Sequence, residues 1–446
     1  MAPRHLIALL LTVLAAAPAG AANETPWLIP QPDHPTPWGL MDFDRSQGSA
    51  RPWERAHSLT GNWNGWRSYL EDDYGVYVLG SYTAEVAGNP VGGENQNVRY
   101  TQNVGLALLV DLEKFAGLPS TRFIASASER TGESNSKKDI GNIYAVQQIY
   151  GGQTTRLVQL ALGTQLFDST LDVVAGRLNG LDDFAASPLY CNAQNLAFCG
   201  NPLSIPIDVN ISSYPNTAWG ARARWQPEPA FYLMTGVYNT RAGFRANKYH
   251  GVDFSIRHDS GAIVITELNV RPQHIGPHGL FTTLPGNYKF GGYWDTEPRL
   301  DFKTGLQERG TGGFYLAFDQ MVWREPDSPD QGPTPWIAFH WAPPDKNPQT
   351  WFVNWGVVYR GMIPGRDGDV AGVYGAYGYL SPDQRAVQRA AGHPGQVYEM
   401  ILEANYRVPV LPWFYLQPDI QGVINPGGTG KIPNALVLAL QFGVPF

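Results

Sequence analysis

The chain has little charge, almost no cysteine and no long hydrophobic run after its first residues. Only 16% of its 446 residues are charged, and the formal net charge is −7. Because a nucleic-acid-binding protein normally presents a basic surface, we expect no nucleic-acid partner. A membrane-spanning helix needs about 20 consecutive apolar residues, and no later stretch approaches that length. The mature chain is therefore predicted to contain no transmembrane helix.

The two cysteines, Cys191 and Cys199, lie close together in a stretch of loop-forming residues. In an oxidising compartment such a pair predicts a disulfide bond that closes a small loop. A zinc site would need two further ligands, and the nearest histidines are far away in the sequence. We therefore expect neither a bound metal nor a cofactor.

The first residues show the pattern of an export signal. Arg4 and His5 precede an apolar run at 6–17 and an Ala-Gly-Ala tripeptide at 19–21. This is the order of a secretory signal peptide, so residues 1–21 are predicted to be removed on export. The apolar run is too short to serve as a membrane anchor.

Residues 22–74 form the next predicted unit, ahead of a domain at 75–446. The part at 22–58 is rich in Pro and Trp without periodicity, which indicates an extended arm. Trp63, Trp66 and Leu70 then follow at helical spacing before Gly75, which predicts a short amphipathic helix. We expect its apolar side chains to pack against the domain that follows.

From position 76 onward, apolar and polar residues alternate almost without interruption. In the last segment every second residue is large and apolar: Leu436, Leu438, Leu440, Phe442, Val444 and Phe446. Strand side chains point alternately to opposite faces, so each such segment has one apolar face. Two architectures give this pattern: a soluble sandwich with its apolar faces packed together, and a transmembrane barrel with its apolar face turned to lipid.

Three features favour the barrel. The alternating segments are closer in length to strands that cross a bilayer than to ordinary strands. Aromatic residues cluster near their ends, where interfacial girdles lie, as at Tyr315, Trp323, Trp336, Trp341 and 413–415. Long connections alternate with tight turns. We predict an all-β fold, a transmembrane antiparallel β-barrel of about 16 strands (16–18) with a short N-terminal helix.

Two connections leave questions open. The segment 143–150 fits either a strand or a loop folded into the barrel. The long connection at 180–215 contains both cysteines, and a cross-linked loop can hold a fixed shape inside a channel. It is our first candidate for the loop that narrows the pore.

Several motifs carry a family resemblance. They are Tyr82-x-x-Glu85, Leu416-Gln417-Pro418-Asp419-x-Gln421, Asn425-Pro426-Gly427-Gly428 and a terminal strand ending in Phe446. With them the chain resembles the carbohydrate-selective porins of the OprB type over most of the mature sequence. The resemblance implies an outer-membrane porin of a Gram-negative bacterium, often a homotrimer, in contact with outer-membrane lipid. It also implies passive diffusion of glucose and related monosaccharides and small oligosaccharides.

A sugar channel needs donors, acceptors and aromatic faces that bind hydroxyls and sugar rings weakly. Arginine offers several donors in one planar group, and carboxylates and amides accept. The predicted lumen and sugar-path residues are Glu85, from the Tyr82-x-x-Glu85 match, and Arg222, Arg224, Glu267, Asn269, Arg271, Glu403, Asn405, Arg407, Asp419 and Gln421. Each can instead pair across strands and only stiffen the wall. Arginines also suit anions, so a small organic acid stays open as a substrate.

No catalytic motif stands out. The histidines are scattered, and the glycine-rich segment 427–431 lacks the first glycine and the Ser/Thr of a phosphate-binding loop. Glu399 and Glu403 share a strand face, as a glycosidase pair would, but alternation gives the same arrangement in any polar lumen. We therefore expect no enzyme. The alternative function is a secreted soluble all-β protein that binds or hydrolyses carbohydrate.

Overall fold

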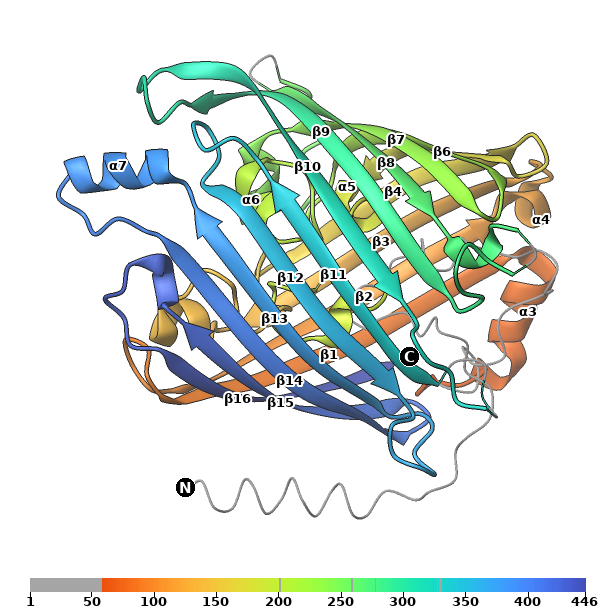
Figure 1. Ribbon diagram of the computed structural model, residues 1–446. Coiled ribbons are helices and arrows are strands. Elements are labelled where there is room, and N and C mark those ends of the chain that lie inside the picture. The colour runs from red at the N-terminus through yellow and green to blue at the C-terminus, as the bar shows by residue number, and fades with distance from the viewer. Residues whose placement is uncertain (1–57, 200–201, 258–259, 277, 327, 329–330) are drawn as a thin grey trace.

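The computed structural model describes residues 58–446, apart from 200–201, 258–259, 277, 327 and 329–330. The predicted signal peptide at 1–21 and the arm at 22–57 lie outside these residues. Strands make up most of the described chain (Figure 1). They are β1 (Val76–Val91), β2 (Val98–Asp111), β3 (Thr121–Gly132), β4 (Thr155–Leu166), β5 (Leu171–Leu178), β6 (Ala218–Glu228), β7 (Phe231–Thr240), β8 (Gly261–Val270), β9 (Gly286–Leu300), β10 (Gln307–Gln320), β11 (Gly332–Trp341), β12 (Gln349–Arg360), β13 (Val370–Leu380), β14 (Tyr398–Leu411), β15 (Phe414–Ile424) and β16 (Ala435–Pro445).

Short helices precede the barrel and lie in its connections. They are α3 (Trp66–Tyr74), α4 (Leu112–Ala116), α5 (Gly180–Asp183), α6 (Ser204–Asp208) and α7 (Pro382–Ala390), with the single turns η3 (Trp63–Gly65), η4 (Ser136–Ile140), η5 (Tyr190–Asn192), η6 (Ala242–Arg245), η7 (Asn247–Tyr249), η8 (Pro272–His274) and η9 (Pro426–Gly428). Helix α3 confirms the predicted N-terminal helix. Across the described part of the chain, no helix has both the length and the apolar character needed to span a bilayer.

The strands form one closed antiparallel barrel. Each pairs with its neighbours in sequence, and β1 closes the ring by pairing with β16, from Ser81 opposite Pro445 to Val91 opposite Leu436. The strand count is sixteen, and the segment 143–150 is a loop rather than a strand. The alternative of two packed sheets is therefore wrong.

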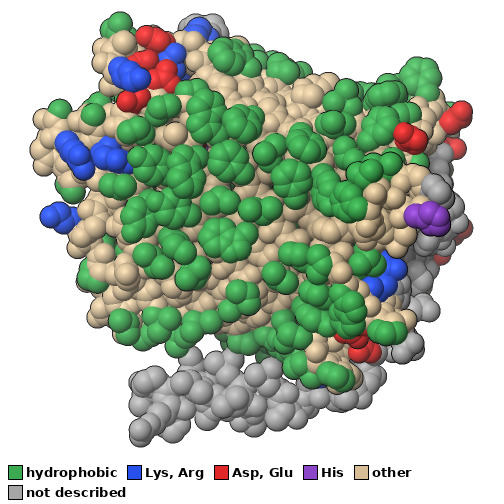
Figure 2. Space-filling view, in the orientation of Figure 1, with side chains coloured by type: hydrophobic (Ala, Val, Ile, Leu, Met, Phe, Trp, Pro, Cys, Tyr) green, Lys and Arg blue, Asp and Glu red, His purple; other side chains and the backbone are tan. Residues whose placement is uncertain are grey.

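The two faces of the barrel wall differ in the way the alternation predicts. In β16, Ala435 and Val437 are buried on the inner face, whereas Leu436 on the outer face is 37% exposed. Figure 2 shows hydrophobic side chains over the middle of the outer wall and charged ones near its ends. A soluble monomer rarely exposes so large an apolar surface, whereas a barrel in a bilayer requires one.

The assignment of aromatic residues to interfacial girdles was wrong in part. Trp323 and Trp341 are exposed on the outer wall, as expected of a girdle. Tyr315, Trp336 and Tyr415, in contrast, are buried and point into the barrel. Alternation puts them on the inner face, and Tyr315 and Trp336 lie in the middle of β10 and β11 rather than at the strand ends where the prediction placed them.

The packing predicted for the N-terminal helix was wrong for one of its three apolar residues. Trp63 and Leu70 are half-buried, whereas Trp66 is 61% exposed. The buried residues of α3 are Arg67 and Glu71, which form an ion pair one turn apart. The helix therefore turns this ion pair toward the barrel and Trp66 outward.

The barrel has two different ends. We call the end where β1 begins and β16 finishes the terminal end, and the opposite one the loop end. Connections at the terminal end include turns of two residues, at 229–230 and 412–413. The loop end carries the long connections at 133–154 and 179–217, which we call the first and second inward loops because both are largely buried.

Candidate functional site: the lumen wall and two inward loops

The two inward loops fill one side of the lumen and pack against the wall formed by β11–β14. Tyr144 of the first loop lies 5.4 Å from Phe352, measured between ring centroids. In the second loop, Tyr190 lies 4.6 Å from Trp336. These side chains belong to one buried hydrophobic cluster. Apolar contact therefore holds the loops inside the barrel, and the inward aromatics of the wall are their packing partners.

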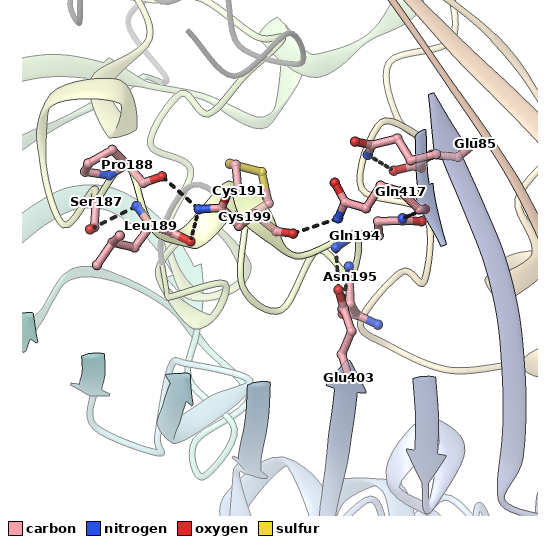
Figure 3. The surroundings of a disulfide bond; sticks show 12 residues. Glu85, Ser187, Pro188, Leu189, Cys191, Gln194, Asn195, Cys199, Glu403 and Gln417 are labelled. Atoms are coloured by element: carbon pink, nitrogen blue, oxygen red, sulfur yellow. Dashed lines mark hydrogen bonds between the residues drawn. A yellow bond between two sulfur atoms is a disulfide. The ribbon is translucent and has the colours of Figure 1, made fainter. Parts of the chain in front are cut away.

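A disulfide bond joins Cys191 and Cys199 and closes the tip of the second loop. Figure 3 shows Glu403 pointing from β14 toward this tip. Its Oε1 accepts a hydrogen bond from the Gln194 N–H at 2.6 Å, and its Oε2 accepts one from the Asn195 N–H at 2.9 Å. Buried backbone donors need an acceptor, and the strand carboxylate supplies two.

Other polar residues on β14 and β15 contact the two inward loops: Asn405 and Gln421 were predicted as lumen residues, whereas Gln417 was not. Asn405 Nδ2 and Gln417 Nε2 both donate to the carbonyl of Asn192, at 2.8 and 2.7 Å. Gln421 Nε2 donates to the Val146 carbonyl of the first loop at 3.0 Å. The polar wall residues here have loop backbone groups as partners.

Arg407 and Asp419 complete this group. Arg407 Nε donates to Gln417 Oε1 at 2.6 Å, and Arg407 Nη2 reaches the Cys191 carbonyl at 3.5 Å. Asp419 Oδ1 accepts from Gln421 Nε2 at 2.8 Å. Arg407 and Asp419 are both largely buried, so they position the residues that hold the second loop.

Glu399 holds the first inward loop in the same way. Its carboxylate accepts from the backbone N–H groups of Ile143 and Tyr144, each at 2.9 Å, and of Gly427 at 2.7 Å. The carboxylates of Glu399 and Glu403, which resembled a glycosidase pair in the sequence, are thus occupied by backbone amides. Sequence reasoning did not single out Glu399 as a site residue, although it shares a strand face with Glu403.

Glu267 plays a third anchoring role on the opposite wall. It accepts from the Ala185 N–H at 2.8 Å and from the hydroxyls of Tyr232 and Tyr315 at 2.6 and 2.7 Å. Lys289 Nζ lies 3.8 Å from the same carboxylate. The start of the second loop is therefore fixed to β8 as its tip is fixed to β14.

Two further predicted residues pair along the wall itself. Glu85 Oε1 accepts from Gln441 Nε2 at 2.8 Å, which joins β1 to β16 across the closure of the barrel. Asn269 Nδ2 donates to Asn287 Oδ1 at 3.1 Å. Both contacts link strands to each other rather than to a loop.

The remaining predicted residues belong to a group of cations on β3, on β6 and directly after β8. Arg222 is buried, bonds Asp172 and lies 3.1 Å from Asp183 of α5. Arg122, which sequence reasoning missed, pairs with Asp172 from β3. This part of the wall joins three strands and the second loop through charge.

Arg224 and Arg271 are the more accessible members of this group. Both are half-buried, and their guanidinium groups lie 5.7 and 5.8 Å from the ring centroid of Tyr232. Such cation–ring contacts orient a guanidinium against an aromatic face. Among the predicted residues, these two half-buried arginines beside the buried ring of Tyr232 are therefore the ones most exposed to a passing polar molecule.

The acidic residues of α5 lie outside the strands and are strongly affected by burial. Burial raises the pKa of Asp182, and the negative charge of neighbouring Asp183 raises it further. Burial also raises the pKa of Asp183, against the opposing effect of Arg222. The two carboxyl groups of α5, at the base of the second loop, therefore hold their protons to higher pH than ordinary carboxyl groups do.

These features define a class: a membrane β-barrel with an apolar exterior, a polar interior and a lumen narrowed by loops, which is a porin. Residues 95–446 match the carbohydrate-selective porin, OprB family. The chain belongs to that family, and the family and the barrel together point to an outer-membrane channel rather than an enzyme.

Individual relatives agree with this assignment. The chain is 29% identical over 422 residues to Porin B of Pseudomonas aeruginosa, an alignment that covers 87% of this chain and 91% of the relative. It is 26% identical to the high-pH structure of Pseudomonas putida OprB, with a TM-score of 0.81, covering 88% of this chain and 99% of the other. The low-pH structure of the same porin matches with 21% identity and a TM-score of 0.58.

Proposed function

We propose that the chain is a passive, carbohydrate-selective porin for glucose and related monosaccharides and small oligosaccharides. Its membership of the carbohydrate-selective family supports a sugar substrate. The observation that carries the proposal is the half-buried pair Arg224 and Arg271 beside Tyr232. The planar guanidinium donors suit sugar hydroxyls.

Two groups of the predicted site residues act on the sugar path in this proposal, whereas Glu85 and Asn269 only link strands of the wall. Arg224 and Arg271 contact the permeating sugar. Glu267, Glu403, Asn405 and Gln421 hold the inward loops, because their polar atoms bond loop backbone groups. The loops then fix the width of the path, and the second loop with its disulfide narrows it.

A second candidate substrate is a small organic acid. Two half-buried guanidinium groups favour an anion as well as a sugar, since arginine binds carboxylates in its planar fork. The candidates differ in charge, so transport assays can separate them.

The test is a liposome-swelling assay with the purified, refolded porin and isotonic glucose, gluconate or a neutral disaccharide. Selective sugar diffusion predicts rapid swelling in glucose and slower swelling in gluconate. Faster entry of gluconate would assign the channel to organic acids, and equal rates for solutes of equal size would show a general diffusion pore.

Three further features of the proposal concern the protein in its membrane. The chain is exported with cleavage of residues 1–21, assembles as a homotrimer and contacts outer-membrane lipid. Mass spectrometry of the mature N-terminus tests the cleavage site. Native gel electrophoresis after mild detergent extraction tests the oligomer, and a monomer band alone would contradict it.

A further inference from the structure

Helix α3 covers the place where the barrel closes. At the terminal end, Gly80 of β1 exchanges backbone hydrogen bonds with the last residue, Phe446, at 2.9 and 2.8 Å. The part of β1 before Gly80 extends past the end of β16, so this edge has no strand partner on that side within the described chain. An unsatisfied strand edge near a bilayer is costly.

Arg67 supplies the missing partner. Its Nη2 donates to the Val78 carbonyl at 2.8 Å, and its Nη1 donates to Ser58 Oγ at 2.9 Å and to the Gly61 carbonyl at 3.2 Å. Glu71 lies 3.4 Å from Arg67 Nε, and both side chains are almost fully buried. The charged side of α3 is therefore fixed to the edge of β1.

The opposite side of α3 carries Trp66 and Tyr69, with the exposed Asp73 at its C-terminal end, and has no covering element in the described chain. Trp66 is 61% exposed and Tyr69 is 44% exposed. Their rings contact each other edge to face, with centroids 5.8 Å apart. A helix that buries an ion pair and exposes a tryptophan is the reverse of a water-facing surface helix.

The exposed aromatics continue a row of apolar side chains around the terminal end. Each even-numbered strand up to β14 has a large exposed apolar residue near its terminal end, either in the strand itself (Trp225 and Leu411) or in the connection that follows it (Phe115, Phe167, Phe281, Trp323 and Ile363). Figure 1 shows α3 and α4 at the same end of the barrel. Helix α3, which carries Trp66 and Tyr69, contacts β1 at the closure and also α4, which carries Phe115.

We infer that α3 is an interfacial membrane helix that seals the closure of the barrel. The partner of its exposed side is bilayer lipid, because Trp66 and Tyr69 continue the lipid-facing surface of the wall. Trp and Tyr are the residues that prefer the boundary between headgroups and acyl chains. Arg67 fixes the helix to β1, and Trp66 with Tyr69 embeds it in the leaflet at the terminal end.

A fluorescent label tests this placement. The full chain carrying Trp66→Cys is labelled with an environment-sensitive dye and reconstituted in phosphatidylethanolamine–phosphatidylglycerol vesicles that contain acyl-chain nitroxide lipids. The native cysteines form a buried disulfide, so only the introduced thiol reacts. Leu268→Cys, on the outer face of β8, is the lipid-facing control, and Lys431→Cys, exposed at the loop end, is the water-facing control.

The label at position 66 should have blue-shifted emission and be quenched by the nitroxide lipids severalfold more than the label at 431, close to the label at 268. Quenching by aqueous iodide as strong as at 431 would overturn the proposal. Protection from both quenchers would also overturn it, because it would show a protein contact. Heat-dependent migration on SDS gels verifies that each labelled variant is a folded barrel.

Discussion

The carboxylate of Glu403 on β14 accepts a hydrogen bond from the backbone N–H of Gln194 at 2.6 Å, across 209 positions of sequence. The bond joins the barrel wall to the disulfide-closed tip of the second inward loop (Figure 3). Glu399 and Glu267 make the equivalent contacts at other points of the inward loops. The shape of the lumen therefore depends on carboxylates of the wall that bind loop backbone.

The first prediction concerns this contact. Glu403→Gln keeps one acceptor oxygen, although two backbone N–H groups of the loop each need an acceptor. The unpaired N–H should destabilise the loop tip by about 1–2 kcal/mol. We expect noisier single-channel current in planar bilayers and faster proteolysis of the second loop. Glu228→Gln, exposed at the end of β6, is the matched control and should behave as wild type. Quiet wild-type current in Glu403→Gln would contradict the anchoring role.

The second prediction concerns the disulfide. Its two cysteines are 8 positions apart, and closing so short a loop stabilises it by about 2–3 kcal/mol in the chain-entropy account. Reduction with dithiothreitol should increase current fluctuations in the wild-type channel. The double variant Cys191→Ser/Cys199→Ser should show these fluctuations without reductant and should not respond to it. A response of the double variant would show that the reductant acts elsewhere.

The third prediction uses a glycine. Gly378 on β13 faces the lumen, and a Cβ at this position would lie 1.6 Å from the Tyr144 hydroxyl. Gly378→Ala should therefore displace the first inward loop and destabilise it by about 1–3 kcal/mol. Gly422→Ala is the control, because no atom lies within 4 Å of its added Cβ. Equal melting temperatures for the two variants in detergent would contradict the prediction.

The fourth prediction concerns acid. Asp139, in η4 of the first inward loop, accepts hydrogen bonds from Arg99, Asn97 and Asn135, and the bond from Arg99 is the main reason that its pKa lies below the ordinary value. A lowered folded-state pKa contributes stability above the unfolded pKa, and this contribution is lost as the pH falls through the folded value. The first loop should become protease-sensitive below about pH 4.

Asp139→Asn should already show that sensitivity at neutral pH and should change less on acidification. Asp168→Asn, exposed in the turn between β4 and β5, keeps the wild-type profile and serves as the control. Limited proteolysis across the pH range measures both. An Asp139→Asn profile identical to wild type would exclude Asp139 as the origin of acid sensitivity.

The fifth prediction concerns the path itself. Arg224→Gln and Arg271→Gln each remove one positive charge beside Tyr232, which should lower the preference for anions over cations and change glucose flux. Reversal potentials in a salt gradient and liposome swelling measure the two effects. Arg324→Gln, exposed in the connection between β10 and β11, is the control. Unchanged selectivity and flux in both variants would remove these arginines from the sugar path.

The sequence by itself determined that each strand has one apolar face, because alternation is a local property of a strand, as at Leu436 and its neighbours. The strand lengths and the aromatic residues then favoured a barrel, with that face outward, over a sandwich. The motifs around Asp419 and Asn425 pointed to the family for the same reason, since each is read from a few adjacent residues.

Only the tertiary structure decided which polar residues hold loops and which remain accessible. The partner of Glu403 is a backbone amide in a distant loop, and no sequence pattern near position 403 indicates that contact. Trp66 and Trp336 show the same limit, because spacing predicts that a residue has a neighbour but not whether that neighbour is lipid, loop or strand. Side-chain periodicity is set within each strand, whereas the lumen is set by contacts between segments that meet only in the folded chain.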